Sequence, residues 1–108
     1  MDKYAAYIKE RSGGLLYEDK FGFFTYRIED ENFIVDEIFV VPRFRNNGQG
    51  KTYSNKIEEF AKDAGCKHVV CTVCIRSKNY MDSFKFIEKM GYRVLKNEYT
   101  LIYLVKEL

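Results

Sequence analysis

The sequence predicts a single α/β domain in which a mostly antiparallel mixed sheet is flanked by helices. Residues 15–41 contain three aromatic and β-branched runs separated by short polar turns, which is typical of an antiparallel meander. Residues 53–64 and 79–90 carry helical patterns, and a strand-like run over 68–75 lies between them. A strand that returns through a helix to another strand implies a parallel pair inside the sheet.

The N-terminal segment is expected to form a short helix. Tyr4, Ala5 and Ile8 recur at helical spacing, and Gly13 follows with Gly14 to end the segment. Short strands are then expected over 15–17 and 23–28. The strongest strand signal of the chain runs over 33–41 and is closed by Pro42, the only proline.

The second half of the chain alternates helical and extended patterns. One apolar stripe of an amphipathic helix is formed by Tyr53, Ile57, Phe60, Ala61 and Ala64. Gly65 and Gly91 suit the C-terminal caps of the two expected helices. Residues 92–95 and 99–105 are expected to close the chain as two further strands, so one domain spans residues 1–108.

The composition argues against nucleic acids and membranes as binding partners. The chain has 108 residues, with 18 basic and 16 acidic residues and a net charge of +2, which gives no electrostatic basis for binding nucleic acid or an anionic membrane. No stretch approaches the roughly 20 apolar residues of a membrane span, and the charged N-terminus does not resemble a signal peptide. The expected location is the cytoplasm.

The cysteines do not predict a metal or redox site. Cys71 and Cys74 have C-x-x-C spacing, but they lie in a run that is expected to be a buried strand. Residues three apart on a strand point to opposite faces, so both thiols would not reach one metal ion. Core packing is therefore favoured over a metal or redox role, and the single His68 has no ligand cluster around it.

The loop after the strongest strand has the residues of an anion site. Arg45-Asn46-Asn47-Gly48-Gln49-Gly50-Lys51 lies between that strand and an amphipathic helix. Two glycines allow a tight turn with bare N–H groups, and the first amides of the helix have no internal partners. Such amides bind phosphate at the positive end of the helix dipole. The spacing fits neither a Walker loop nor a Rossmann fingerprint, and a plain glycine-rich turn is the alternative for the loop alone.

Three segments in the right order resemble the GNAT superfamily of N-acetyltransferases. Phe39 to Gly50 resembles the GNAT signature, in which a strand ending Val-x-Pro precedes (Arg/Gln)-x-x-Gly-x-(Gly/Ala). Phe86 to Tyr92 looks like the second landmark, a helix ending Tyr-Glu-Lys-Leu-Gly-Phe, and Tyr103 to Leu108 resembles the last strand. The landmarks cover about Gly14 to the C-terminus. They imply a GNAT-like acyl-CoA N-acyltransferase fold in an N-terminally truncated form.

The resemblance implies a transfer of acetyl from acetyl-CoA to a primary amine without a metal. The coenzyme's pyrophosphate would rest on the amides of Arg45, Asn46, Asn47, Gly48, Gln49, Gly50 and Lys51. Its pantetheine arm would pair with Phe39, Val40 and Val41, and a backbone N–H of Val40 or Phe39 would stabilise the thioester oxyanion. Asn79 and Ser83 lie where family members place polar contacts to the coenzyme, although Asn79 comes one residue early.

The resemblance also implies catalytic candidates. Asp36 and Glu37 are candidates for the base that accepts the ammonium proton; as neighbours on a strand they are expected to point to opposite faces, so at most one would lie in the cleft. Family members commonly protonate the leaving thiolate with a tyrosine, but that position here is Ile87. Tyr80 and Tyr92 are nearby substitutes, but packing is favoured over catalysis for each of them, and the thiol could also leave through solvent.

The N-terminal segment before the first predicted strand is shorter than in typical family members. This predicts either an open acceptor site, suited to a lysine or an N-terminus on a protein, or a site completed by a second subunit in a homodimer. A small amine is the alternative acceptor. The alternative function is a catalytically impaired GNAT-fold module that acts through protein–protein contacts. The sequence does not identify the acceptor.

Overall fold

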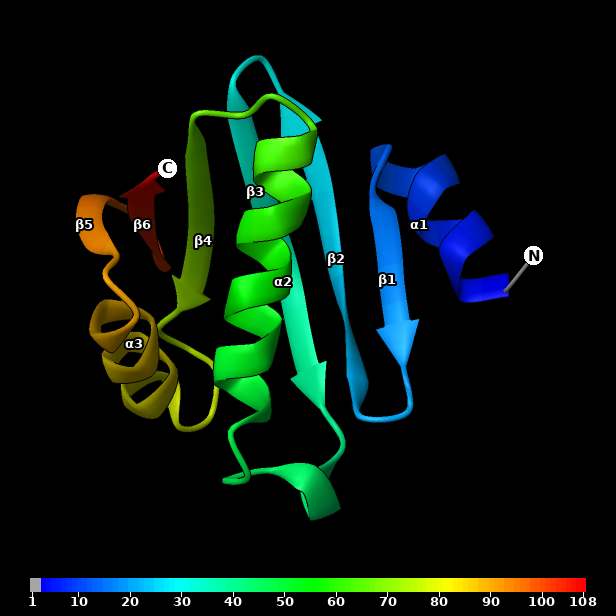
Figure 1. The fold of residues 1–108 in the computed structure, drawn as a ribbon. Helices are drawn as coiled ribbons and strands as arrows, with labels where there is room; N and C mark the ends of the chain where they lie inside the picture. The colour runs from blue at the N-terminus through cyan, green and yellow to red at the C-terminus, as the bar shows by residue number, and fades with distance from the viewer. Residues whose placement is uncertain (1–2) are drawn as a thin grey trace.

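The computed structural model describes residues 3–108, and its elements follow the predicted order (Figure 1). They are α1 (Lys3–Ser12), β1 (Leu15–Asp19), β2 (Gly22–Glu29), β3 (Asn32–Val40), a 3-10 turn η1 (Pro42–Phe44), α2 (Gln49–Asp63), β4 (His68–Cys74), α3 (Tyr80–Lys89), β5 (Arg93–Glu98) and β6 (Leu101–Glu107). Helix α2 begins four residues before the apolar stripe, so the last three residues of the predicted loop form its first turn.

All six strands belong to one mixed sheet in the order β1-β2-β3-β4-β6-β5. Strands β1, β2 and β3 form the predicted antiparallel meander, and β3 pairs with β4 in parallel. In Figure 1, α2 lies across β3 and β4 with α3 on the same side, whereas α1 lies near the β1 edge. The mixed sheet with flanking helices is the fold that the sequence predicts.

The main core lies between the sheet and α2. Tyr53, Ile57 and Ala61 of the predicted stripe are buried, whereas Ala64 at its end is exposed. Phe24 of β2 is fully buried and contacts the rings of Tyr53 and Phe60. Other large buried side chains of this core are Phe33, Val69 and Leu104.

The opposite face of the meander meets α1. Side chains on a strand alternate between faces, so Phe23 and Thr25 point away from α2 when Phe24 points towards it. The Tyr4 ring of α1 lies edge-on to Phe23 with centroids 5.6 Å apart. The short N-terminal helix therefore covers part of the second face of the sheet.

A β-bulge interrupts the pairing of β2 with β3. Thr25 lies opposite Glu37, but Tyr26 lies opposite Val35, so Asp36 is an extra residue on β3. A bulge bends its strand and increases the local twist. The parallel pairing of β3 with β4 also ends here, at Val35 opposite Cys71, and the two strands continue without pairing.

The Asp19 carboxylate at the end of β1 links the meander to α2. It accepts hydrogen bonds from the Tyr53 hydroxyl at 2.6 Å, the Phe21 N–H at 2.9 Å and the Tyr17 hydroxyl at 3.1 Å. Burial alone would raise the pKa of Asp19, but these hydrogen bonds outweigh it and hold the pKa below its ordinary value.

We expect Asp19→Asn to lower the free energy of unfolding by about 1–2 kcal/mol at neutral pH, because charge-assisted hydrogen bonds become weaker neutral ones. Since the folded-state pKa is lowered, the wild-type carboxylate stabilises the fold above the ordinary aspartate pKa and loses this contribution as the pH falls through the lowered value. Urea unfolding between pH 7 and pH 3 should show the two proteins converging in acid. Asp30→Asn in an exposed turn is the matched control; a constant gap across this range would contradict the assignment.

Candidate active site

The two central strands diverge into a cleft. Beyond Val35 and Cys71 the C-terminal halves of β3 and β4 are not hydrogen-bonded to each other. The Val41 N–H donates to the Phe21 carbonyl at 2.8 Å, on the β2 side of the chain. Since N–H groups alternate sides along an extended strand, the Val40 N–H is directed away from β2, into the cleft. Of the two predicted oxyanion donors, Val40 has the suitable direction and Phe39 does not.

The Arg45 side chain folds back on the same strand. Its Nε donates to the Val40 carbonyl at 2.9 Å, and its guanidinium lies 5.5 Å from the centre of the Phe39 ring. The positive charge of Arg45 therefore lies against the edge of β3, where the pantetheine arm is predicted to pair.

The N-terminus of α2 lies at the end of this strand and loop. Gly48 precedes the helix with φ +81°, and no side chain caps the first turn. The first amide with a helical partner is that of Thr52, which donates to the Gly48 carbonyl at 3.1 Å. The N–H groups of Gln49, Gly50 and Lys51 have no acceptor within the helix, as the loop pattern predicts, so they can bind an anion.

The second glycine of the loop has a different role from the one predicted. Gly50 is helical and does not form the turn. A Cβ atom at this position would lie 2.7 Å from Cζ of Phe86 in α3. The absence of a side chain therefore lets the start of α2 approach α3.

We expect Gly50→Ala to lower the free energy of unfolding by about 1–2 kcal/mol, because the added methyl group overpacks against the Phe86 ring. Combining it with Phe86→Leu should recover part of this loss, measured by urea unfolding. Gly48→Ala meets no neighbouring atom, but its positive φ costs about 1 kcal/mol. Phe86→Leu should not relieve that cost, and an equal recovery of both alanine variants by Phe86→Leu would contradict the contact.

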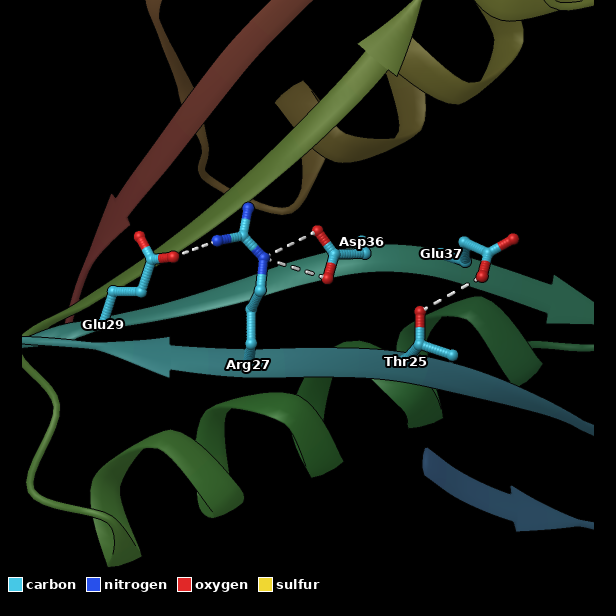
Figure 2. A network of polar contacts seen from close by, with 5 residues as sticks. All are labelled: Thr25, Arg27, Glu29, Asp36 and Glu37. Carbon is cyan, nitrogen blue, oxygen red and sulfur yellow. Dashed lines mark hydrogen bonds and ion pairs between the residues drawn. The ribbon is translucent and has the colours of Figure 1, made fainter. Parts of the chain in front are cut away.

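Asp36 and Glu37 point to the same face of the sheet, contrary to the sequence-based expectation (Figure 2). The bulge breaks the alternation, so both carboxylates lie on the side away from α2. Both Asp36 oxygens accept from the Arg27 Nε, at 3.3 and 3.2 Å, and Arg27 also pairs with Glu29. Glu37 Oε1 accepts from the Tyr4 hydroxyl at 3.0 Å and from the Thr25 hydroxyl at 3.4 Å.

These carboxylates line a hollow of about 740 Å³ between α1 and the meander. Its lining consists of four α1 residues and four strand residues: Tyr4, Tyr7, Ile8, Arg11, Thr25, Arg27, Asp36 and Glu37. Glu37 is three residues before Val40 on β3, so the hollow lies beside the cleft on the same strand. An acid–base group therefore lies next to a potential oxyanion donor.

Residues 2–92 match the model of the acetyltransferase (GNAT) family. The chain belongs to the GNAT acetyltransferase family. A search of the curated proteins gives no significant match.

Solved GNAT structures share this fold. A GNAT family acetyltransferase from Elizabethkingia anophelis, solved with acetyl-CoA bound, is 20% identical, with a TM-score of 0.77 over 99% of this chain and 84% of that one. The PaiA N-acetyltransferase from Thermoplasma acidophilum, in complex with coenzyme A, is 18% identical, with a TM-score of 0.75 over 94% of this chain and 66% of that one. An IAA acetyltransferase from Bacillus cereus is 17% identical, with a TM-score of 0.75 over 100% of this chain and 85% of that one.

In this GNAT domain, the predicted residues of α3 lie at the helix N-terminus. Asn79 precedes α3 with φ +60°, and the Ser83 N–H donates to its carbonyl at 3.5 Å. Ser83 is one turn before Phe86, whose ring meets Gly50, so it lies on the α2 side of the helix. Both side chains are exposed.

The two tyrosines considered as general acids differ in burial. Tyr92 is 6% exposed and is hydrogen-bonded to Cys71 in the core. Burial and the neighbouring thiol raise the pKa of Tyr92. Tyr92 is therefore a packing residue. Tyr80 lies in the first turn of α3 beyond the end of β4 and is only partly buried. Ile87, at the usual tyrosine position, packs against the core.

Most residues that line the hollow were not among the predicted site residues. Tyr4 and Ile8 were recognised only as helix-forming residues, and Tyr7, Arg11 and Arg27 were not considered. The signal was present, because residues 4, 7, 8 and 11 fall on one helical face. The spacing of two between Thr25 and Arg27 likewise places them on one face of a strand.

The two cysteines of the C-x-x-C pair differ in burial. Cys71 is buried, and burial raises the pKa of its thiol to about 12. Cys74 lies on the opposite face of β4, half-buried. Within residues 3–108, no group of three or more potential metal ligands is present, and no helix is long and apolar enough to cross a membrane.

Proposed function

We propose that the protein is an acetyl-CoA-dependent N-acetyltransferase that transfers the acetyl group directly to a primary amine, with the cytoplasm as its expected location. The observation that carries the proposal is the unpaired cleft between β3 and β4, with the bare amides of α2 at one end and Glu37 beside it. The co-substrate seen in the Elizabethkingia anophelis structure supports this choice of ligand.

Acetyl-CoA would be held mainly by backbone groups. The amides of Gln49, Gly50 and Lys51, with the loop from Arg45 to Gly48, would bind the pyrophosphate. The open edge of β3 from Phe39 to Val41 would pair with the pantetheine amides. Arg45 would release the Val40 carbonyl for this pairing. Asn79 and Ser83 would add polar contacts from the start of α3.

Glu37 is the better base of the two carboxylates. Both oxygens of Asp36 are engaged by Arg27, which fixes that carboxylate as part of an ion pair. Both hydrogen bonds to Glu37 end on Oε1 and come from neutral hydroxyl groups, so Oε2 would meet the incoming ammonium. The Tyr4 and Thr25 hydroxyls hold the carboxylate in place, which makes them positioning residues.

The reaction needs three events from this chain. Glu37 accepts a proton from the ammonium, so that the neutral nitrogen can form a bond to the thioester carbon. The Val40 N–H stabilises the negative charge that develops on the carbonyl oxygen. The C–S bond then breaks and the electron pair leaves on sulfur. The nitrogen loses its second proton to water, and the thiolate takes a proton from Tyr80 or from water. An amide and free coenzyme A result.

Thiol release from acetyl-CoA in the presence of a panel of primary amines tests the proposal. Amine-dependent thiol release, with the acetylated product seen by mass spectrometry, is the expected result. Calorimetry should show coenzyme A binding in parallel. Coenzyme binding without acetyl transfer to any amine would instead support the binding module, in which Ile87 reflects lost catalysis.

A further inference from the structure

Among the described residues, the acceptor hollow contains one positive and one negative side chain that form no ion pair. Four charged residues line it, but Arg27 and Asp36 neutralise each other. Neither Arg11 nor Glu37 takes part in an ion pair among residues 3–108. Their hydrogen bonds go to neutral hydroxyls, from Arg11 to Tyr7 and from Tyr4 to Glu37.

These two charges lie at opposite ends of the hollow. Tyr4 contacts Glu37 at one end, and Arg11 is seven residues further along α1, which corresponds to about 10 Å of helix. On the sheet side of the hollow, Arg27 lies two residues beyond Thr25 along β2, a separation of ~7 Å in the same direction. Glu37 is at the end near the cleft, and Arg11 is at the remote end.

The remote end is suited to a carboxylate. A guanidinium has five N–H donors in a planar fork that matches a carboxylate. Within the described part of the chain, Arg11 donates one hydrogen bond, from Nη1 to the Tyr7 hydroxyl, at 2.9 Å. The Tyr7 ring also lies 5.8 Å from the guanidinium carbon, which holds the side chain against the wall. Ile8 and the tyrosine rings provide apolar surface between the two ends.

We propose that the acceptor is a small ω-amino acid or short peptide whose reacting amine and carboxylate lie about 7–10 Å apart. The amine meets Glu37 and the carboxylate meets Arg11, with the linking atoms along α1. An α-amino acid is too short to reach both groups, because its amine and carboxylate share one carbon. This inference names the substrate class of the proposed acetyltransferase and rests on that function.

A matched set of acceptors tests the charge pair. The set is 6-aminohexanoate, its uncharged amide, hexylamine, and norleucine, an α-amino acid with the same carbon count. We expect kcat/KM for 6-aminohexanoate to exceed that for the amide by about tenfold, mainly through a lower KM, because one charge-assisted pair is added. Equal use of the acid and the amide, or a preference for norleucine, would overturn the inference.

Two variants on α1 test whether Arg11 causes the preference for the acid over the amide. Arg11→Gln should raise KM for 6-aminohexanoate about tenfold, leave KM for the amide unchanged, and leave kcat for both unchanged. Lys9→Gln removes an equal charge from the same helix outside the hollow, and it should change neither acceptor. A loss with Arg11→Gln that is equal for the acid and the amide would show a structural effect only.

Binding measured without turnover separates this inference from the proposed function. Saturation-transfer NMR with the coenzyme A-loaded protein should detect 6-aminohexanoate, and Arg11→Gln should weaken that signal. Binding without acetylation would leave the inference standing and contradict the acetyltransferase activity. Acetylation of all amines alike would support the activity and overturn the inference, and absence of both binding and turnover would overturn both.

Discussion

Replacing Glu37 by glutamine is expected to lower kcat/KM for acetyl transfer about 100-fold or more, which is the usual contribution of a general base. Glutamine keeps an oxygen that can accept from Tyr4 and Thr25, so the hollow should retain its shape. The deficit should shrink as the pH approaches the pKa of the acceptor amine, since more amine is then neutral in solution. Steady-state rates between pH 7 and pH 10 measure both effects.

Asp36→Asn is the matched control on the same strand. It weakens the pair with Arg27 but removes no proposed base, so we expect less than a tenfold loss. Calorimetry should give the same affinity for coenzyme A in both variants, because neither residue lies in the cofactor cleft. Full activity of Glu37→Gln, or a larger loss with Asp36→Asn, would transfer the base role to Asp36.

Gln49→Glu is expected to have opposite effects on stability and on cofactor affinity. A carboxylate in the first turn of α2 stabilises the helix through its dipole, by about 0.3–1 kcal/mol. The same charge repels a bound pyrophosphate, and at ~5 Å in water this costs about 1 kcal/mol for each phosphate charge. We expect the affinity for acetyl-CoA to fall about tenfold or more while the melting temperature rises.

Asn55→Asp adds the same charge to α2 beyond its first turn. Residue 55 is exposed and lies ~9 Å of helix after Gln49, so both effects should be small. Calorimetry with acetyl-CoA and thermal unfolding of the three proteins make the comparison. An unchanged affinity in Gln49→Glu would mean that the amides of α2 do not bind the pyrophosphate.

The sequence was sufficient to predict the order of elements, because each depends on a local pattern. The aromatic runs of β1 and β2, the stripe of Tyr53, Ile57 and Ala61, and the glycines after both helices act within a few residues. The bare amides at the start of α2 were predictable for the same reason, because they follow from the helix start alone.

The hollow between α1 and the meander was less predictable because it depends on contacts between distant segments. The bulge at Asp36 has no signature in the sequence, and a regular strand would have turned Glu37 towards α2. The hydrogen bond from Tyr4 to Glu37 joins residues 33 apart in the chain. The contact of Gly50 with Phe86 likewise requires the packing of α2 against α3, so the glycine was assigned to the turn.

The extra residue at position 36 determines whether β3 and β4 can pair along their full length. With Asp36 present, β3 leaves β4 after Val35, and the gap that remains is the proposed site for the nucleotide carrier. Without it, the two strands could continue their ladder towards residues 40 and 74, and each added pair would fill that gap with protein backbone. A chain one residue shorter at this point would make a more regular sheet with no room for the proposed co-substrate.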